Sequence, residues 1–171
     1  MSTFAGNVIK YFVCPICKSE LVITSRQFYC NNCQRKFTKR DSLYNFVTQE
    51  GKYSDAADEI MDNILLKMDS LPWLEVIYRA FAEKNPWLYQ IITDFTRTDY
   101  LFLQEFSKQD LVLDVGSGWG QSAFALAKHV KEVIAVEPNS KRINFIAKRI
   151  NQEKVDNILP VQATSRRLPF K

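Results

Sequence analysis

The sequence is poor in the features that mark membrane proteins and histidine-based active sites. Its 171 residues contain one histidine, His129, and five glycines. No apolar run approaches the roughly 18 residues of a membrane span, and residues 1–10 lack the apolar core of a signal peptide. These absences favour a cytoplasmic location without a membrane span. His129 closes a predicted helix, where a cation interacts favourably with the helix dipole, so we assign it no catalytic role.

Cysteine is also scarce, and all four cysteines fall into two C-x-x-C pairs, Cys14 with Cys17 and Cys30 with Cys33. Two such pairs can complete the tetrahedral set of four thiolates that zinc prefers. We therefore predict a structural zinc ion with no open ligand position. A pair of disulfides is the alternative, which a cytosolic chain disfavours. A redox C-x-x-C is less favoured still, since one pair would suffice for it.

The cysteines define the first predicted domain, a zinc ribbon over residues 8–47. Residues 20–24 and 27–30 are expected to form a hairpin between the two pairs. Such a ribbon has almost no core of its own, so the metal would supply its folding energy.

The net charge of +4 is unevenly distributed along the chain. Residues 1–41 carry a net charge of +5, residues 42–110 carry −6, and residues 111–171 carry +5. A basic first block could attract nucleic acid, but a solvated basic surface on a small domain explains it at least as well.

The second predicted segment, residues 54–107, is helical. Apolar residues recur at helical spacing, and Ser54 and Asn85 are suitable N-caps. The expected helices span about 55–69, 72–84 and 86–106. The segment is dense in aromatic side chains, for which helical core packing is a better explanation than an acceptor-binding lid.

The third segment, residues 109–171, is organised around a glycine-rich turn. Residues 111–115 are almost wholly apolar, which predicts a strand buried on both faces of a parallel sheet. Glycines at alternate positions follow, and residues 121–129 have a helical pattern. Strand, glycine turn and helix open a nucleotide-binding βαβ fold, in which bare backbone and free N–H groups meet the ligand. An ordinary strand-to-helix turn is the alternative, and the predicted fold class is α/β, Rossmann-like.

A second predicted strand, residues 133–136, ends at Glu137, 17 residues after Gly120. A carboxylate at this position has two acceptor oxygens and can hold both ribose hydroxyls of a nucleoside. This role suits NAD and S-adenosylmethionine equally well. The turn, however, reads G-x-G-x-G and not the dinucleotide fingerprint G-x-G-x-x-G, and this spacing disfavours NAD.

The turn and the aspartate two residues before it resemble motif I of the class I S-adenosylmethionine-dependent methyltransferases, type 11-like. A third predicted strand, residues 158–161, leads into Ala-Thr-Ser-Arg-Arg-Leu-Pro-Phe, which resembles the family's G-D-A-x-x-L-P-F segment. Thr164, with Ser165 beside it, replaces the aspartate that meets the adenine amino group in that family. The pattern is similar to that of a ribosomal RNA guanine methyltransferase family with an N-terminal zinc site. Residues 37–47 likewise resemble the end of a zinc-ribbon family often fused to methyltransferases, although Asp41-Ser-Leu-Tyr replaces its Asp-Gly-Ile-Pro.

The resemblance implies three groups of cofactor contacts and a larger sheet. Glu137 would hold the ribose, and Thr164 or Ser165 would meet the adenine. The methionine end of the cofactor would be lined by Asp114, Gly116, Ser117, Gly118 and Gly120. The helices of residues 54–107 would cover the cleft. The family sheet has seven strands in the order 3-2-1-4-5-7-6, of which this sequence supplies three, so we expect an N-terminal fragment of a longer enzyme in which strand 111–115 is an exposed apolar edge.

The sequence therefore supports two hypotheses about function. The leading hypothesis is methyl transfer from S-adenosylmethionine to an acceptor that the sequence does not identify, with a slight preference for RNA because the ribbon is basic. The alternative is a non-catalytic zinc-ribbon and nucleoside-binding module that engages RNA or a protein partner. No catalytic residue can be named, and the oligomeric state stays open.

Overall fold

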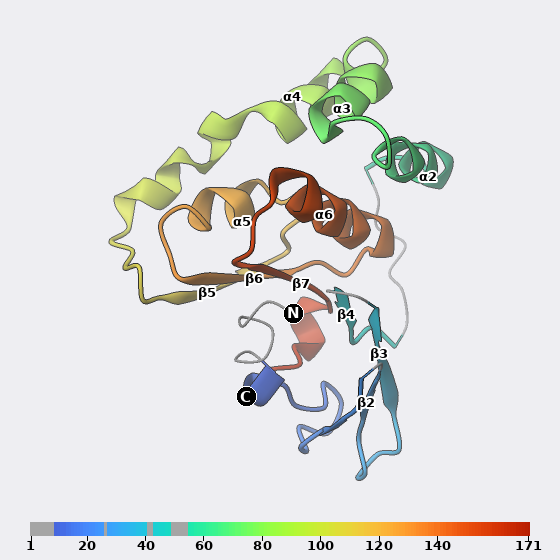
Figure 1. The fold of residues 1–171 in the computed structure, drawn as a ribbon, viewed down its shortest axis with the longest axis vertical. Coiled ribbons are helices and arrows are strands. Elements are labelled where there is room, and N and C mark those ends of the chain that lie inside the picture. Colours follow the sequence, from blue (N-terminus) through green and yellow to red (C-terminus); the bar gives the residue numbers. More distant parts are fainter. Residues whose placement is uncertain (1–8, 26, 41–42, 49–54) are drawn as a thin grey trace.

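The computed structural model describes residues 9–171 except for 26, 41–42 and 49–54. Within these residues, seven strands form one sheet in the order β1-β2-β3-β4-β7-β6-β5 (Figure 1). The strands are β1 (Val22–Ile23), β2 (Gln27–Tyr29), β3 (Lys36–Arg40), β4 (Leu43–Asn45), β5 (Leu111–Val115), β6 (Glu132–Val136) and β7 (Ile158–Gln162). The α-helices are α2 (Asp58–Lys67), α3 (Trp73–Phe81), α4 (Pro86–Thr93), α5 (Gln121–Leu126) and α6 (Ser140–Glu153). Short 3₁₀ helices are η1 (Ile9–Tyr11), η2 (Phe95–Leu103) and η3 (Ser165–Arg167).

The strands β5, β6 and β7 are parallel and are connected through α5 and α6. Both helices cover the same face of the sheet (Figure 1). Their apolar side chains pack on alternate residues of β6, with Phe124, Ile143 and Ile146 against Val133 and Ala135. The predicted α/β, Rossmann-like fold class is therefore confirmed, because a parallel sheet with crossover helices is what defines it.

The N-terminal strands extend the same sheet. We call residues 9–47, with the gaps given above, the cysteine ribbon. Its strands β1 to β4 are antiparallel to one another, and β4 pairs in parallel with β7, where Tyr44 is opposite Val161. The sequence did not predict this pairing, because its two partners lie far apart in the chain.

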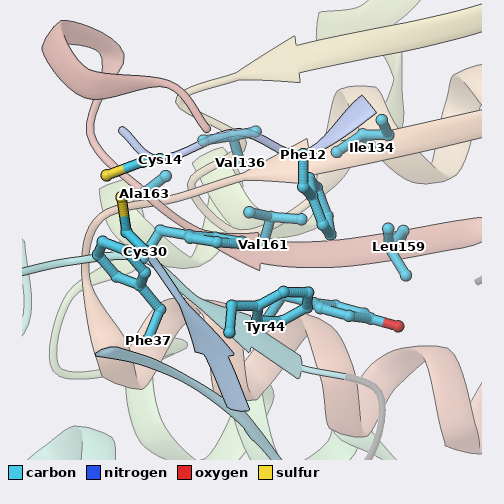
Figure 2. Packing of buried hydrophobic residues seen from close by; sticks show 12 residues of the cluster. Phe12, Cys14, Cys30, Phe37, Tyr44, Ile134, Val136, Leu159, Val161 and Ala163 are labelled. Atoms are coloured by element: carbon cyan, nitrogen blue, oxygen red, sulfur yellow. The ribbon is translucent and has the colours of Figure 1, made fainter. Parts of the chain in front are cut away.

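The cysteine ribbon also covers the second face of the parallel sheet. Its aromatic side chains Phe12, Phe28 and Tyr44 share one buried cluster with Leu159 and Val161 of β7 (Figure 2). The prediction that the ribbon has almost no core of its own is therefore incomplete. It lacks a separate core but uses one in common with the sheet, so its stability is tied to that of the parallel strands.

The helices α2, α3 and α4 pack outside α6, and they differ from the predicted helices in their limits. The predicted helix over 86–106 is wrong beyond Thr93, because the carboxylate of Asp94 accepts hydrogen bonds from the N–H and hydroxyl of Thr96 and the chain continues as η2. Asn85 caps α4 as predicted. The expected cap Ser54 lies outside the described residues, and α2 begins at Asp58. In the described part of the chain, no helix has the length and apolar character needed to cross a bilayer.

The predicted burial of strand 111–115 on both faces is wrong. Within the described residues β5 is the edge of the sheet, and Leu111, Leu113 and Val115 are all exposed. The expectation of an exposed apolar edge is the one that the structure confirms. The three exposed side chains alternate along the strand, as expected when one face of a strand is covered by helices and the other is not.

Two leucines on this sheet provide a matched test of the described packing. Leu113 on β5 is 39% exposed, whereas Leu159 on β7 is 2% exposed and lies in the cluster shared with the cysteine ribbon. We expect Leu159→Ala to lower the free energy of unfolding by about 2–5 kcal/mol. Leu113→Ala should cost about 1 kcal/mol or less, because fewer contacts are lost. Denaturant titration of both variants measures the difference, and equal losses would contradict the packing on the second face.

Candidate functional site

The carboxyl ends of the three parallel strands meet at one edge of the sheet. Asp114 lies at the end of β5, Glu137 directly follows β6, and Thr164 follows β7 by two residues. The register places Val115 opposite Val136, and Val136 opposite Val161, so these strands end level with one another. In open α/β sheets this edge is where ligands bind. The structure thus brings the three groups of sequence-predicted cofactor residues to one edge.

The glycine turn, residues 116–120, adopts backbone angles that only glycine accepts easily. The φ angles of Gly116, Gly118 and Gly120 are +84°, +55° and +90°. A Cβ atom added at Gly116 would meet nothing within 4 Å, and at Gly118 its nearest neighbour would be the Gly116 oxygen at 3.9 Å. At Gly120 it would press on Phe124 and Ile146 at 3.2–3.3 Å. Gly120 is therefore needed for packing, while the first two glycines leave open space beside the backbone.

The turn is held against the end of β6. The N–H groups of Gly116 and Ser117 donate to the carbonyl of Val136 at 2.8 and 3.0 Å, and the hydroxyl of Ser117 donates to the carbonyl of Asp114 at 2.9 Å. The Ser117 side chain is buried, and its hydrogen bond to Asp114 O closes the turn. This hydrogen bond thus fixes the conformation of the turn. The turn leads directly into α5, whose first N–H groups come next in the chain.

Glu137 joins the turn to the next helix. Its Oε2 accepts the N–H of Gly118 and its Oε1 accepts the N–H of Asn139, both at 2.9 Å. The residue is only 4% exposed, and burial raises the pKa of its carboxyl, partly offset by these two N–H donors and by Arg142. Each carboxylate oxygen can accept a second hydrogen bond, so the group retains acceptor capacity toward a ligand.

Asp114 carries an unsatisfied acceptor. Its Oδ2 is buried and has no hydrogen-bond partner among the described residues. Burial raises the pKa of this carboxyl, while the Ser117 hydroxyl and the Ala123 N–H act in the opposite direction. A buried carboxylate oxygen without a partner is unfavourable, and such groups concentrate at functional sites. An ammonium or other donor from a ligand would satisfy it.

The third group, Thr164 and Ser165, lies at the start of η3. Thr164 is half-buried and its carbonyl accepts the N–H of Arg167 at 3.0 Å, whereas Ser165 is exposed. Both hydroxyls are thus outside the sheet core. His129, for which we predicted no catalytic role, is exposed beyond the far end of α5, and its ring contacts Phe102.

Sequence reasoning missed a polar cluster beside Glu137. Asp55 pairs with the guanidinium of Arg142 and accepts the indole N–H of Trp119 at 3.2 Å. Trp119, which stands inside the glycine turn, also packs edge-on against Phe81 of α3. The cluster therefore links the segment before α2 to the turn and to α6. The only local signal was a tryptophan inside a glycine turn, since the other partners are distant in sequence.

The four cysteines form a second candidate site. Cys14 and Cys33 have Sγ atoms 3.5 Å apart, those of Cys17 and Cys30 are 3.4 Å apart, and all four Sγ atoms lie within 4.8 Å of one another. Zinc–sulfur bonds of about 2.3 Å require tetrahedral sulfur separations of about 3.8 Å. All four cysteines are free of disulfides. The cluster thus has the composition and spacing for one tetrahedral metal ion.

The two C-x-x-C pairs have the same backbone geometry. In the first, the N–H of Cys14 donates to Ser19 O and Lys18 takes a left-handed φ of +59°. In the second, the N–H of Cys30 donates to Arg35 O and Gln34 takes the same φ. The two C-x-x-C pairs therefore contribute their thiols to the cluster from two turns of the same conformation. Burial raises the pKa of the Cys33 thiol to about 12, whereas hydrogen bonds with Ser19 and other groups lower the pKa of the Cys17 thiol to about 5.

Comparison with known proteins finds a family similarity for the last part of this chain. Residues 112–171 match the family profile described as "Methyltransferase domain". A Dictyostelium discoideum protein named as a methyltransferase is 43% identical over 51 residues, which cover 30% of this chain and 17% of that protein. The chain therefore spans less than a fifth of the length of this curated relative.

Solved structures that are similar to part of this chain include two proteins at a TM-score of 0.40. YcgJ from Bacillus subtilis is 28% identical, with 42% of this chain and 30% of that chain covered. TYW2 from M. jannaschii, solved in complex with AdoMet, is 25% identical, with 51% and 39% covered. The family match, and not these partial similarities, supports a methyltransferase domain over residues 112–171.

The raised pKa of Asp114 gives a pH test of this edge. Its carboxyl binds a proton more tightly in the folded chain than at its ordinary pKa of 3.8. The resulting stabilisation is complete below about pH 3.8 and is lost as the pH rises through the folded-state pKa. Asp114→Asn removes this dependence. We expect the stability of the original chain relative to the variant to fall as the pH rises above about 3.8 in urea titrations; a constant difference would contradict the burial of this carboxyl.

Proposed function

We propose that the edge formed by the glycine turn, Glu137 and Thr164 binds S-adenosylmethionine, and that the protein containing this chain transfers its methyl group to an acceptor. The single observation that carries the proposal is the arrangement of Glu137, whose carboxylate is fixed by the Gly118 and Asn139 N–H groups at the end of β6. Both oxygens are positioned before any ligand arrives, so little ordering would be needed on binding.

The open backbone at Gly116 and Gly118 fits the proposed ligand. Side chains are absent where the methionine end would lie against the turn, and added Cβ atoms would project into that space. The unsatisfied Oδ2 of Asp114 is an acceptor at the same end, and the ammonium group of the methionine portion is a suitable donor. Ser117 would act by holding the turn, since its hydroxyl is already bonded to Asp114 O. Gly120 would act through packing.

The ribose and adenine contacts follow the order of the strands. Glu137 would accept hydrogen bonds from the ribose hydroxyls with the lone pairs that its two backbone donors leave free. Only 4% of the residue is exposed, so the ribose would meet the edge of the carboxylate. Thr164 or Ser165 would accept a hydrogen bond from the adenine amino group, more weakly than the carboxylate that the family pattern has there.

The cofactor supplies a methyl group on a sulfonium, and the protein's part would be to hold donor and acceptor in line. We name no catalytic base, since the polar groups at this edge are assigned to binding. The acceptor is proposed to be RNA, on the basis of the net charge of +5 over residues 1–41. A non-catalytic module that binds a nucleoside without turnover would share the edge, and an RNA-dependent methyl transfer assay distinguishes the two functions.

The four cysteines would hold a structural zinc ion. Four thiolates leave no coordination position for water or substrate, so the ion would stabilise the cysteine ribbon and take no part in methyl transfer. The predicted domains, a ribbon over 8–47, a helical cover over 54–107 and a partial methyltransferase domain over 109–171, remain part of this proposal. So does the cytoplasmic location.

Cofactor binding can be tested with two glutamates on the same strand. Glu137 follows the carboxyl end of β6, and Glu132 begins the strand at the opposite end. We expect S-adenosylhomocysteine to bind in calorimetric titrations and Glu137→Gln to weaken it roughly 10- to 100-fold, because a charge-assisted hydrogen bond contributes about 1.5–3 kcal/mol. Glu132→Gln should leave the affinity unchanged. NAD binding in place of S-adenosylhomocysteine, or equal effects of both variants, would refute the assignment.

The metal can be tested by its removal. We expect one zinc ion per chain by elemental analysis, and a chelator should lower the thermal stability of the protein because the cysteine ribbon shares its core with the sheet. Cys30→Ser should abolish zinc retention, since Cys30 is fully buried and supplies one of four ligands. Thr38→Ala, an exposed residue of β3 in the same ribbon, is the control. Zinc-free protein of unchanged stability would contradict a structural role.

A further inference from the structure

The first cysteine turn lies directly against the segment after β7. The N–H of Val13, immediately before Cys14, donates to Pro169 O at 2.9 Å. The ammonium of Lys18, immediately after Cys17, donates to Leu168 O at 2.7 Å. These bonds tie the two ends of the first C-x-x-C turn to residues 164–170, the segment that carries the proposed adenine contacts.

Side-chain packing reinforces these bonds. Phe12 pairs with Phe170 in an antiparallel bridge, and their ring centroids are 5.4 Å apart. Cys14 and Cys30 are fully buried in the same cluster as Ala163, the residue before Thr164. Figure 2 shows Ala163 beside both cysteines. Two of the four thiols therefore pack on the end of β7, where the adenine segment begins.

Among the described residues, those of the cysteine ribbon provide most of the contacts that hold residues 164–170 in place. The helix η3 within the segment is a single turn without a buried residue. Ser165, Arg166 and Arg167 are exposed, and the turn is closed by a hydrogen bond internal to the segment, from Arg167 N–H to Thr164 O. A short exposed turn is readily displaced. Its position thus depends on the anchoring of residues 168–170 by Phe12, Val13 and Lys18.

We infer that metal binding at the four cysteines and ligand binding at the strand edge are coupled, and that Lys18 is a positioning residue that transmits the coupling through Leu168. The inference rests on the proposed function for the identity of the ligand. The metal would fix the C-x-x-C turn in which Lys18 has its left-handed backbone conformation. That turn in turn fixes residues 164–170, so Thr164 and Ser165 are in place before the cofactor binds.

Coupling of this kind is reciprocal. If zinc raises the affinity for S-adenosylhomocysteine by some factor, S-adenosylhomocysteine must raise the affinity for zinc by the same factor. A ribbon that served only as a separate domain would give a factor of one. Measuring both affinities therefore tests the coupling without any assay of methyl transfer.

The experiment compares two lysines of the cysteine ribbon in the full chain. Lys18→Met removes the hydrogen bond to Leu168 O and retains the aliphatic stem, whereas Lys36→Met changes an exposed lysine of β3 as the control. In calorimetric titration of the zinc-loaded proteins, we expect Lys18→Met to weaken S-adenosylhomocysteine binding about three- to tenfold. Both variants should retain one zinc ion, and Lys36→Met should bind the ligand as the original chain does. Removal of zinc should weaken binding further.

Hydrogen exchange separates the failure of this inference from the failure of the proposed function. Zinc removal should speed exchange over residues 163–170 and leave residues 111–126, which lie outside the cluster shared with the cysteine ribbon, protected. If this exchange pattern is found in a chain that does not bind S-adenosylhomocysteine, the cofactor assignment is refuted. The same result would still support the dependence of residues 163–170 on the metal. Ligand affinity unchanged by both Lys18→Met and zinc removal would overturn the coupling, as would equal loss of protection over both segments.

Discussion

A parallel sheet presents apolar side chains on both faces, and β6 and β7 of this chain are covered on both. In this chain α5 and α6 cover one face, and the cysteine ribbon covers the other over β6 and β7. The same ribbon adds β4 beside β7, so that this edge of the parallel sheet is paired. The cysteines lie near the strand edge because Cys14 and Cys30 pack in one cluster with Ala163, directly after β7.

The two candidate sites are consequently parts of one structural unit. The helices on the first face position the glycine turn, since Gly120 packs closely on Phe124 of α5 and Ile146 of α6. The ribbon on the second face positions the segment that follows β7. Glu137, between these two supports, is held by backbone donors from the turn and from the start of α6. The two sides of the strand edge thus depend on different layers of the fold, one on the helices and the other on the cysteine ribbon.

The features that the sequence predicted are those that need particular residue types over a short stretch. Positive φ angles favour glycine at 116, 118 and 120, and the cluster of four thiols needs cysteine at fixed spacing. The roles of the individual residues remain proposals. The pairing of Tyr44 with Val161 and the contact between Asp55 and Arg142 join distant parts of the chain, and no local pattern encodes them. The end of α4 did have a local cause, the hydrogen bonds between Asp94 and Thr96. From the sequence alone, however, polar residues that end a helix in this way look the same as polar residues that a helix tolerates.

Electrostatics gives an independent reason to place a cationic ligand at the glycine turn. Burial raises the pKa of both Asp114 and Glu137, so the chain alone stabilises neither carboxylate as well as water does. Gly118 and Asn139 offset part of this cost at Glu137 with hydrogen bonds, whereas one oxygen of Asp114 has no partner among the described residues. A ligand that carries positive charge on an ammonium and a sulfonium would lower both pKa values and recover this cost on binding. NAD lacks an ammonium group and cannot donate to Asp114 in this way, so the electrostatics of the edge and the spacing of the glycines favour the same cofactor.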